Sequence, residues 1–241
     1  MGNLVTDKVG KNTLDVIGEA YQFNKWMFKT ILPFSKGKIL EIGSGLGNIS
    51  TFFLENKNEI FLTDLRVEYC TLLQDKFESK PNLLGVDQLN LIHPDFDKVY
   101  DNHLEKYDTV FALNVIEHIR NDNLAISNCK KLLKNNGHLI ILVPSYQKLY
   151  NRFDEELGHF RRYTQKSLLE LFLKNHFSVV HKQYFNLIGI AGWYISGSLM
   201  KKESIPSNQM KAYDKMVPVW QVLDKLVQNK IGLSTIIIGR K

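Results

Sequence analysis

The sequence is poor in cysteine and has no long apolar run. Its 241 residues include only two cysteines, Cys70 and Cys129, so no disulfide framework and no cysteine-based metal motif is expected. No stretch is long and apolar enough to cross a bilayer, and the amino terminus has no secretory leader pattern. We therefore predict a cytoplasmic protein in a reducing compartment, with no transmembrane segment.

Concentrated charge is also missing. The chain has 31 Lys and Arg against 25 Asp and Glu, a net charge of +6, yet no basic block exceeds two residues. Scattered basic residues are typical of a solvated surface, whereas nucleic-acid binding favours a clustered basic face. A nucleic acid is therefore not the expected partner. The hydrophobic content of 44% suits one α/β domain with a sizeable core.

The segment 38–48, which reads KILEIGSGLGN, is the most informative pattern of the chain. The apolar residues at 39, 40 and 42 predict a short buried parallel strand, and three alternating glycines after it predict a tight turn. Apolar residues at helical spacing then predict a helix. Glycine lets a ligand approach the backbone closely, and the first N–H groups of the helix point into the turn. We expect a nucleotide-type ligand there.

The spacing of the glycines indicates which nucleotide. A dinucleotide fingerprint, G-x-G-x-x-G, would need a glycine where the chain has Asn48, which disfavours a nicotinamide oxidoreductase. The order Glu41-x-Gly43-x-Gly45-x-Gly47 instead resembles motif I of the class I S-adenosylmethionine-dependent methyltransferases. S-adenosylmethionine carries an ammonium and a sulfonium group but no pyrophosphate, so an acid at Glu41 suits it.

Strands and helices alternate along the rest of the chain. We predict further strands at 59–64, 83–86, 107–113, 138–143, 177–184 and 234–239, with helices at 66–78, 123–133 and 165–176. This order matches the class I fold, a doubly wound, seven-stranded, mostly parallel sheet whose last strand lies antiparallel beside the fifth. We predict a single domain over 1–241, divided into a helical cap (1–36), a core sheet (37–184 and 234–241) and a helical insertion or lid (185–233), for which a dimer face or membrane-surface patch is the alternative.

Several cofactor contacts follow from the strand ends. Asp64 comes 21 positions after Gly43, where such folds place a carboxylate on the ribose hydroxyls; the alternative is a cap for the next helix. Asn90 stands where the methyltransferase pattern has an acid that reads adenine, with Asp87 as the other candidate. The residues expected to contact S-adenosylmethionine are Glu41, Gly43, Ser44, Gly45, Asn48, Asp64, Leu65, Asn90, Leu91 and Asn114.

The stretch 149–164, which reads LYNRFDEELGHFRRYT, lies where the acceptor pocket of a class I fold is built. Together with NVIEHI at 114–119 it resembles a bacterial subgroup of these methyltransferases with the signature GHYRRYT. His159, Arg161 and Arg162 have two interpretations: they bind an anionic acceptor, or they brace the loop against the acids just upstream.

Aromatic residues before the first strand offer a second part of the acceptor pocket. Tyr21 and Trp26 lie in an amphipathic helical pattern that ends near Pro33. They are predicted to cover the ligand, and the alternative is an aromatic stripe packed on the core.

His118 follows the fourth strand and is the candidate general base, with a structural histidine as the alternative. No His, Asp and Cys cluster has ligand spacing, and Glu117 is adjacent to His118 in the sequence, so we predict no metal and activity that survives a chelator.

The predicted function is methyl transfer from S-adenosylmethionine to oxygen or nitrogen of a small molecule, with anionic acceptors included, by a monomer or homodimer. The alternatives are an RNA methyltransferase and a non-catalytic protein that keeps the fold. No Asn/Asp-Pro-Pro-aromatic motif follows the fourth strand, and neither cysteine follows a proline. Methyltransferases of exocyclic base amines and of cytosine C5 are therefore disfavoured.

Overall fold

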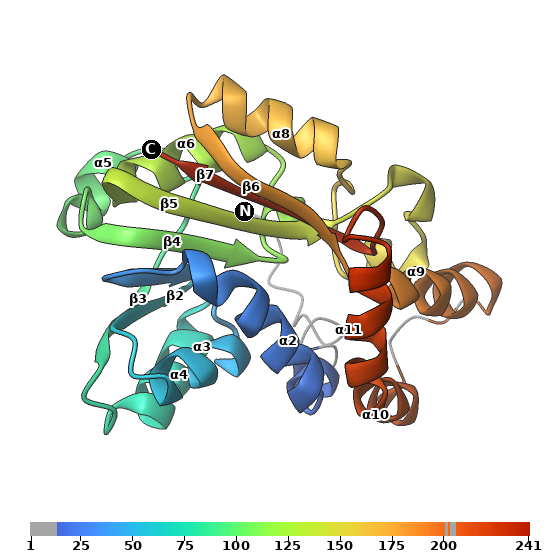
Figure 1. Ribbon diagram of the computed structural model, residues 1–241. Helices are drawn as coiled ribbons and strands as arrows, with labels where there is room; N and C mark the ends of the chain where they lie inside the picture. Colours follow the sequence, from blue (N-terminus) through green and yellow to red (C-terminus); the bar gives the residue numbers. More distant parts are fainter. Residues whose placement is uncertain (1–13, 201, 203–205) are drawn as a thin grey trace.

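Short runs rich in isoleucine, leucine and valine form one sheet in the computed structural model, which describes residues 14–200, 202 and 206–241 (Figure 1). The strands are β1 (Ile39–Ile42), β2 (Ile60–Asp64), β3 (Leu83–Gln88), β4 (Tyr107–Leu113), β5 (Leu133–Pro144), β6 (Ser178–Phe185) and β7 (Ser234–Arg240). Their order across the seven-stranded sheet is β3-β2-β1-β4-β5-β7-β6. Strand β7 runs antiparallel to both β5 and β6, and the other neighbours are parallel. The predicted doubly wound sheet is confirmed, including its antiparallel last strand.

Helices cover both faces of this sheet. They are α2 (Tyr21–Ile31), α3 (Asn48–Glu55), α4 (Val67–Phe77), α5 (Phe96–Val99), α6 (Asp122–Leu132), α7 (Arg152–Glu156), α8 (Gln165–Lys174), α9 (Leu187–Trp193), α10 (Ser207–Lys215) and α11 (Val217–Leu226). Short 3₁₀ segments are η1 (Leu32–Phe34), η2 (Asp101–His103), η3 (Ile116–His118) and η4 (Gln147–Leu149), and a π-helical segment is η5 (Tyr194–Leu199). Thr164 caps α8, since its side chain accepts a hydrogen bond from the Ser167 N–H.

Two hydrophobic cores lie on the two faces of the sheet. Leu40 and Ile42 of β1 pack with α5, α6 and α8, whereas Ile39 packs on the other face with α2, α3 and α4. In β5, Leu139 and Ile141 alternate in the same way with Ile140. A strand buried on both faces cannot show a polar alternation, which explains the continuous apolar runs in the sequence.

The boundary between α6 and β5 differs from the prediction. The sequence predicts a helix over 123–133 and a strand that begins at 138, but α6 ends at Leu132 and β5 begins at Leu133. Leu133 is fully buried and pairs with Tyr107 of β4. Because this side chain is buried in the sheet, the strand begins several residues before Gly137. Asn136 takes a left-handed conformation (φ 66°) inside the strand.

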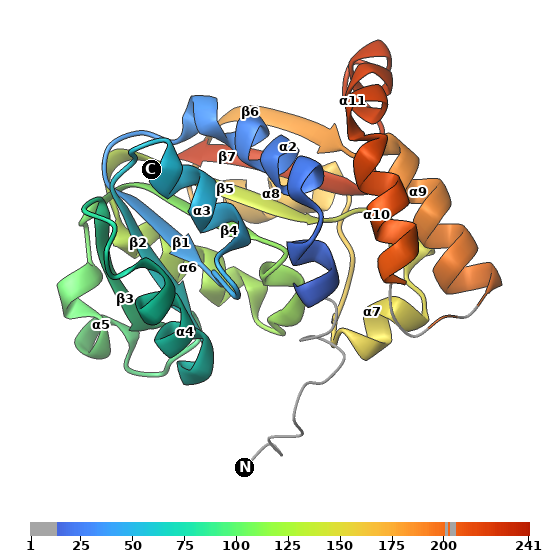
Figure 2. The same cartoon turned by 90° about the horizontal axis from the view of Figure 1, so that it is seen from below.

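The helices of the 185–233 insertion gather at one end of the sheet. Figure 2 shows α9, α10 and α11 together beyond the ends of the central strands, and Figure 1 places them on the same side. Asp214 of α10 accepts hydrogen bonds from the backbone N–H groups of Gln22 (3.2 Å) and Phe23 (2.8 Å), which joins α10 to the first turn of α2. Asp224 of α11 accepts from the N–H of Asn186 (2.7 Å), just before α9.

Parts of two predicted segments lie outside the described residues: positions 1–13 of the helical cap, and positions 201 and 203–205 of the insertion. In the portion that is described, none of the helices has the length and apolar character needed to cross a bilayer.

Candidate active site

A cavity of about 710 Å³ opens at the carboxyl ends of the central parallel strands. The turn after β1 and the ends of β2 and β4 form its floor, while α2, the segment 153–162, α9 and α10 form its walls. Its size lies within the range of small-molecule sites. All ten residues expected to contact the cofactor line this cavity.

The glycine turn has the backbone geometry that its sequence predicts. Gly43, Gly45 and Gly47 have φ values of 74°, 52° and 75°, a region that favours glycine. A Cβ atom on Gly43 would lie 2.5 Å from a methyl group of Val115, so a side chain there would fill the cradle. The Ser44 hydroxyl is buried and has no hydrogen-bond partner among the described residues. The turn therefore presents a polar, open backbone to a ligand.

Asp64 is held at the end of β2 in a position that suits a ribose. One carboxylate oxygen accepts a hydrogen bond from the Gly45 N–H (3.0 Å), and the other accepts from the Arg66 N–H (3.0 Å). Each oxygen keeps a second lone pair for a hydroxyl group. Arg66, rather than Asp64, occupies the cap position of α4, and no side chain caps that helix. The geometry supports the ligand role over the helix-cap alternative.

Of the two candidates for the adenine contact, Asn90 lines the cavity and Asp87 does not. Asn90 lines the cavity, and its side-chain oxygen accepts from the Ile92 N–H (3.0 Å), which fixes the amide. Asp87 lies outside the cavity, where its carboxylate is 3.2 Å from the ring of His103. An amide at this place can both donate to and accept from a base.

Glu41 is more deeply buried than expected for a carboxylate that only pairs with the charge of a ligand. It lies in the middle of β1, is 4% exposed, and accepts a hydrogen bond from the Ser50 hydroxyl. Burial raises the pKa of Glu41 from 4.5 to about 8, although the hydrogen bond from Ser50 opposes this rise. In the ligand-free protein the side chain is therefore protonated at neutral pH, and a nearby ammonium group would favour its ionised form.

This pKa predicts how stability depends on pH. The folded protein keeps a proton on Glu41 that the unfolded chain releases above pH 4.5, so the free energy of unfolding should fall as pH rises from 4.5 to about 8. The slope from this one group is at most about 1.4 kcal/mol per pH unit. Urea unfolding of the wild type and of Glu41→Gln, which stays neutral, should diverge across this window. Parallel curves would contradict the assignment.

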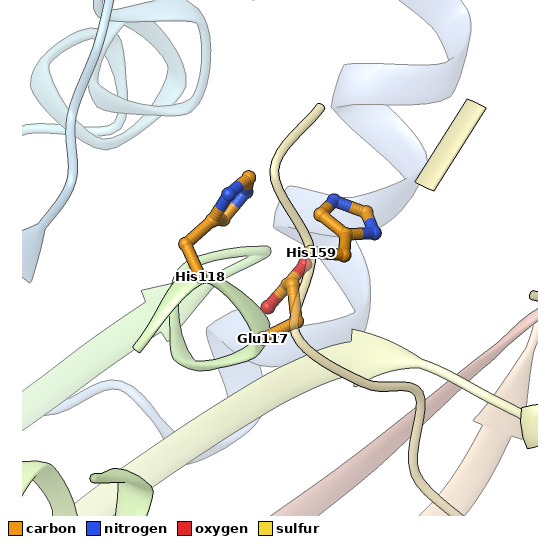
Figure 3. A group of neighbouring side chains, drawn as sticks. All are labelled: Glu117, His118 and His159. Carbon is orange, nitrogen blue, oxygen red and sulfur yellow. The ribbon is translucent and has the colours of Figure 1, made fainter. Parts of the chain in front are cut away.

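A buried carboxylate lies at the acceptor end of the cavity. Glu117 of η3 is fully buried, and neither carboxylate oxygen has a hydrogen-bond partner within the described part of the chain. Burial raises the pKa of Glu117 to about 7, against the opposing charges of His159 and Arg162. His118 is exposed beside it and lines the cavity, as does His159. Figure 3 shows the three side chains together.

Sequence reasoning selected His118 as the base and missed Glu117. Glu117 could have been considered as a candidate base, because it belongs to the same NVIEHI segment as His118. Its burial depends on His159 and Arg162, more than 40 positions along the chain, so it could not be inferred from local pattern. The prediction that there is no metal site was based on the spacing of residues in the sequence. The fold, however, places His159 beside Glu117 and His118, although it is about 40 positions away in the chain.

Asp154 organises the loop that carries His159 and Arg162. One of its oxygens accepts from His159 Nδ1 (2.7 Å) and from Arg162 Nε (2.8 Å), and the other accepts from the Asn151 N–H (3.0 Å). Burial alone would raise the pKa of Asp154, but these donors hold it below its usual range. An ionised Asp154 requires a proton of His159 on Nδ1, so the neutral form of His159 carries its lone pair on Nε2.

Arg162 is a brace, as one of its two interpretations proposed. Its side chain is fully buried, its Nη1 donates to the Ser145 carbonyl (3.1 Å), and the guanidinium lies 4.5 Å from the ring centre of Trp193. Although it lines the cavity, Asp154 neutralises its charge. Arg161 lies outside the cavity, in a groove beside α8, where it pairs with Asp122 (2.6 Å) rather than with the upstream acids. Its predicted contact with an acceptor is not supported.

The two aromatic residues predicted to cover the ligand also lie outside the cavity. Tyr21 is 50% exposed and packs on Phe52, with ring centres 5.3 Å apart. Trp26 is buried against Phe185, with ring centres 4.3 Å apart. The core alternative describes Trp26, because its position on α2 faces the sheet. The same helix reaches the cavity instead through Phe23, Asn24 and Met27.

Comparisons with known proteins agree with this geometry. Residues 40–139 match a family model described as a methyltransferase domain. A highly reducing polyketide synthase, rstn3, of Aspergillus nomiae is 32% identical over 126 residues, which is 48% of this chain and 5% of that protein. The polyketide synthase PksR of Bacillus subtilis is 32% identical over 128 residues, 49% of this chain and 5% of that protein. The chain thus spans about 5% of the length of these relatives.

Solved structures share the fold at low sequence identity. An S-adenosylmethionine-dependent methyltransferase from Archaeoglobus fulgidus has a TM-score of 0.61 at 18% identity, covering 92% of this chain and 94% of that chain. The phosphoethanolamine N-methyltransferase 2 of Haemonchus contortus, in complex with S-adenosylmethionine, has a TM-score of 0.62 at 15% identity, covering 96% and 60%. The DszA carbon methyltransferase has a TM-score of 0.58 at 16% identity, covering 95% and 57%.

The family match, together with this fold, confirms the predicted class I methyltransferase and S-adenosylmethionine as its cofactor. The residues of the cavity fit this cofactor: the glycine cradle, the buried Ser44 hydroxyl and the oriented Asp64 carboxylate are the groups its amino-acid and ribose parts need. The bacterial subgroup with the GHYRRYT signature stays a prediction. Residues 40–139 therefore match a methyltransferase domain, and the chain has the fold of solved class I S-adenosylmethionine-dependent methyltransferases.

Proposed function

We propose that the protein methylates a small, mostly apolar molecule whose accepting atom must lose a proton. The observation that supports this is the position of Glu117. The cofactor features lie at one end of the cavity, and at the other end an apolar wall closes on this buried carboxylate, whose oxygens have no partner among the described groups.

The acceptor end of the cavity is largely hydrophobic. Its wall comes from α2, the segment 153–160, α9 and α10, and the apolar side chains are Phe23, Met27, Phe153, Leu157, Phe160, Trp193 and Met210. Arg162, the buried arginine of this wall, is already neutralised by Asp154. An apolar acceptor gains from burial here. Asp154 balances the charge of Arg162, and among the guanidinium nitrogens Nη2 is the one without a hydrogen-bond partner in the described residues, so an anionic acceptor would meet little net positive charge.

Methyl transfer places a further demand on the acceptor. The methyl group leaves sulfur as a cation equivalent, the S–C electron pair stays on sulfur, and the acceptor supplies the pair for the new bond. A neutral amine already has such a pair, while a hydroxyl group or a C–H group beside a carbonyl must first lose a proton. An unpartnered carboxylate at this place serves the second kind of acceptor, by general-base catalysis.

Several of the relatives agree with a carbon acceptor, although the phosphoethanolamine N-methyltransferase with the same fold acts on nitrogen. Two solved structures of this fold are named as carbon methyltransferases, CurJ and DszA, and the curated relatives are polyketide synthases. We therefore propose an acyl compound with an acidic C–H group beside a carbonyl as the first acceptor class, and a hydroxyl group as the second.

The test is a screen of β-ketoacyl thioesters, phenols and amines with labelled S-adenosylmethionine, read by the transfer of label and by the mass of one added methyl group. Label on a thioester or a phenol supports the proposal, and label on amines alone contradicts it. Asp64→Ala provides the internal control for the cofactor end: its loss of ribose contacts should weaken S-adenosylmethionine binding by about 1–3 kcal/mol in calorimetry.

Asp87→Ala is the matched variant for Asp64. Asp87 also lies near the end of a neighbouring strand, but its carboxylate is exposed and faces away from the cavity. We expect its affinity for S-adenosylmethionine to equal that of the wild type. Equal affinities for both variants would contradict the ribose assignment of Asp64 and leave the acceptor screen unaffected.

A further inference from the structure

Three side chains of metal-ligand type meet at the acceptor end of the cavity. Glu117 and His118 come from η3 after β4, and His159 comes from the loop between α7 and α8. One ligand atom from each lies within 4.8 Å of the other two. Figure 3 shows the carboxylate of Glu117 near both imidazole rings, and the rings are 4.6 Å apart at 83°.

We propose that Glu117, His118 and His159 bind one divalent transition-metal ion, of which Zn²⁺ is the reference. Two imidazole nitrogens with one carboxylate oxygen are a donor set that zinc and other first-row metals use in open catalytic sites. Mg²⁺ and Ca²⁺ prefer oxygen donors, so they fit less well. Three protein ligands leave at least one position for a water or an acceptor oxygen.

The isolation of Glu117 is an independent reason for a cation. A fully buried carboxylate without a hydrogen-bond partner is costly, and a cation would satisfy both oxygens. The charge count also permits it. Glu117 and Asp154 contribute two negative charges when ionised, while Arg162 contributes one positive charge through its pair with Asp154. The ion would therefore enter a site with net negative charge.

Asp154 gives His159 the support that a metal-bound histidine needs. Histidine ligands usually donate their second ring N–H to a carboxylate, which fixes the tautomer and the ring orientation. Here His159 Nδ1 donates to Asp154 at 2.7 Å, so Nε2 is the coordinating nitrogen. Asp154 is itself held by Arg162 Nε at 2.8 Å. Ligand atoms around zinc lie roughly 3.3 Å apart. A rotation of the exposed His118 would close much of the remaining distance.

Such an ion would act on the acceptor that the proposed function places here, and this step rests on that function. By binding an oxygen of the acceptor, it would stabilise the anion left after the proton passes to water. The electron pair of that anion then forms the bond to the methyl group, and the S–C pair remains on sulfur as before. Glu117 is then a ligand, and no free carboxylate is needed.

Metal binding can be measured without any acceptor. Protein freed of metal with a chelator is titrated with Co²⁺, followed by visible absorption, and with Zn²⁺ in competition with a chromophoric chelator. We expect one ion per chain, with Co²⁺ bands of low coordination number. His118→Ala and His159→Ala should each weaken binding at least tenfold. His118→Ala is the variant least able to disturb folding, because its side chain is exposed.

His93→Ala is the matched control, since His93 lies outside the cavity on the loop after β3. The affinity of this variant for Co²⁺ and Zn²⁺ should equal that of the wild type. Absence of stoichiometric binding, or equal affinity in the wild type and in both His118 and His159 variants, would overturn the metal site. Calorimetry of S-adenosylmethionine with metal-free protein reports on the cofactor end alone. The acceptor screen is run with metal-loaded and with metal-free protein, and label on a thioester or a phenol in either preparation supports the proposed function whether or not a metal binds. The two proposals can therefore fail separately.

Discussion

Replacement of Asp154 by alanine is expected to lower the free energy of unfolding by about 3–5 kcal/mol, because it leaves a buried charge without its partner. Arg162 has no exposed side-chain surface, and Asp154 is also fully buried. The same change removes the hydrogen-bond acceptor of His159 Nδ1 and of the Asn151 N–H. Urea unfolding at fixed pH measures the loss directly, and activity need not be assayed.

An exposed ion pair provides the comparison for Asp154. Lys131 and Asp97 are 2.6 Å apart, and their side chains are 41% and 61% exposed. Asp97→Ala should change stability by less than about 1 kcal/mol, because water screens such a pair. A second comparison is the double variant Asp154→Ala with Arg162→Met, which removes both charges and should recover part of the loss. If Asp154→Ala and Asp97→Ala both lowered the free energy of unfolding by less than about 1 kcal/mol, the stabilising role of the Asp154–Arg162 pair would be contradicted.

The fold could be predicted because its signals are local. The apolar run of β1, the three glycines and the apolar helix face of α3 follow one another within a single segment, and each depends on near neighbours. Asp64 could be placed at the end of β2 for the same reason, since strand length and the glycine turn set its distance from Gly43. The ten residues predicted to contact the cofactor line one cavity because the carboxyl ends of parallel strands meet at one edge.

The acceptor end could not be predicted in the same way. The pairs Arg162–Asp154 and Arg161–Asp122 differ only in which way adjacent side chains point, and a sequence pattern does not contain that direction. Tyr21 and Trp26 share a helix with Phe23 and Met27, yet only the second pair reaches the cavity. Contacts between η3 and a loop about 40 positions later decide the environment of Glu117.

Glu117→Gln is expected to lower kcat/KM for the acceptor by about 10²–10⁴-fold, the usual contribution of a positioned acid or base. The amide has nearly the same shape as the carboxylate but can neither take a proton nor serve as an anionic metal ligand. Affinity for S-adenosylmethionine should be unchanged, because the glycine turn and Asp64 are untouched. The melting temperature should be equal to or above that of the wild type, since a buried acid without a partner has been removed.

Glu155→Gln provides the matched control for Glu117, because it makes the same chemical change at an exposed position of α7. Its kcat/KM and its melting temperature should both equal those of the wild type. Treatment with a chelator then separates the two ways in which Glu117 can act. If a metal ion stabilises the acceptor anion, the chelated wild type should lose as much activity as Glu117→Gln. If the carboxylate takes the proton itself, the chelated wild type should keep its activity. A Glu117→Gln enzyme that retains kcat/KM within about threefold of the wild type would refute both, because each requires the negative charge of this side chain.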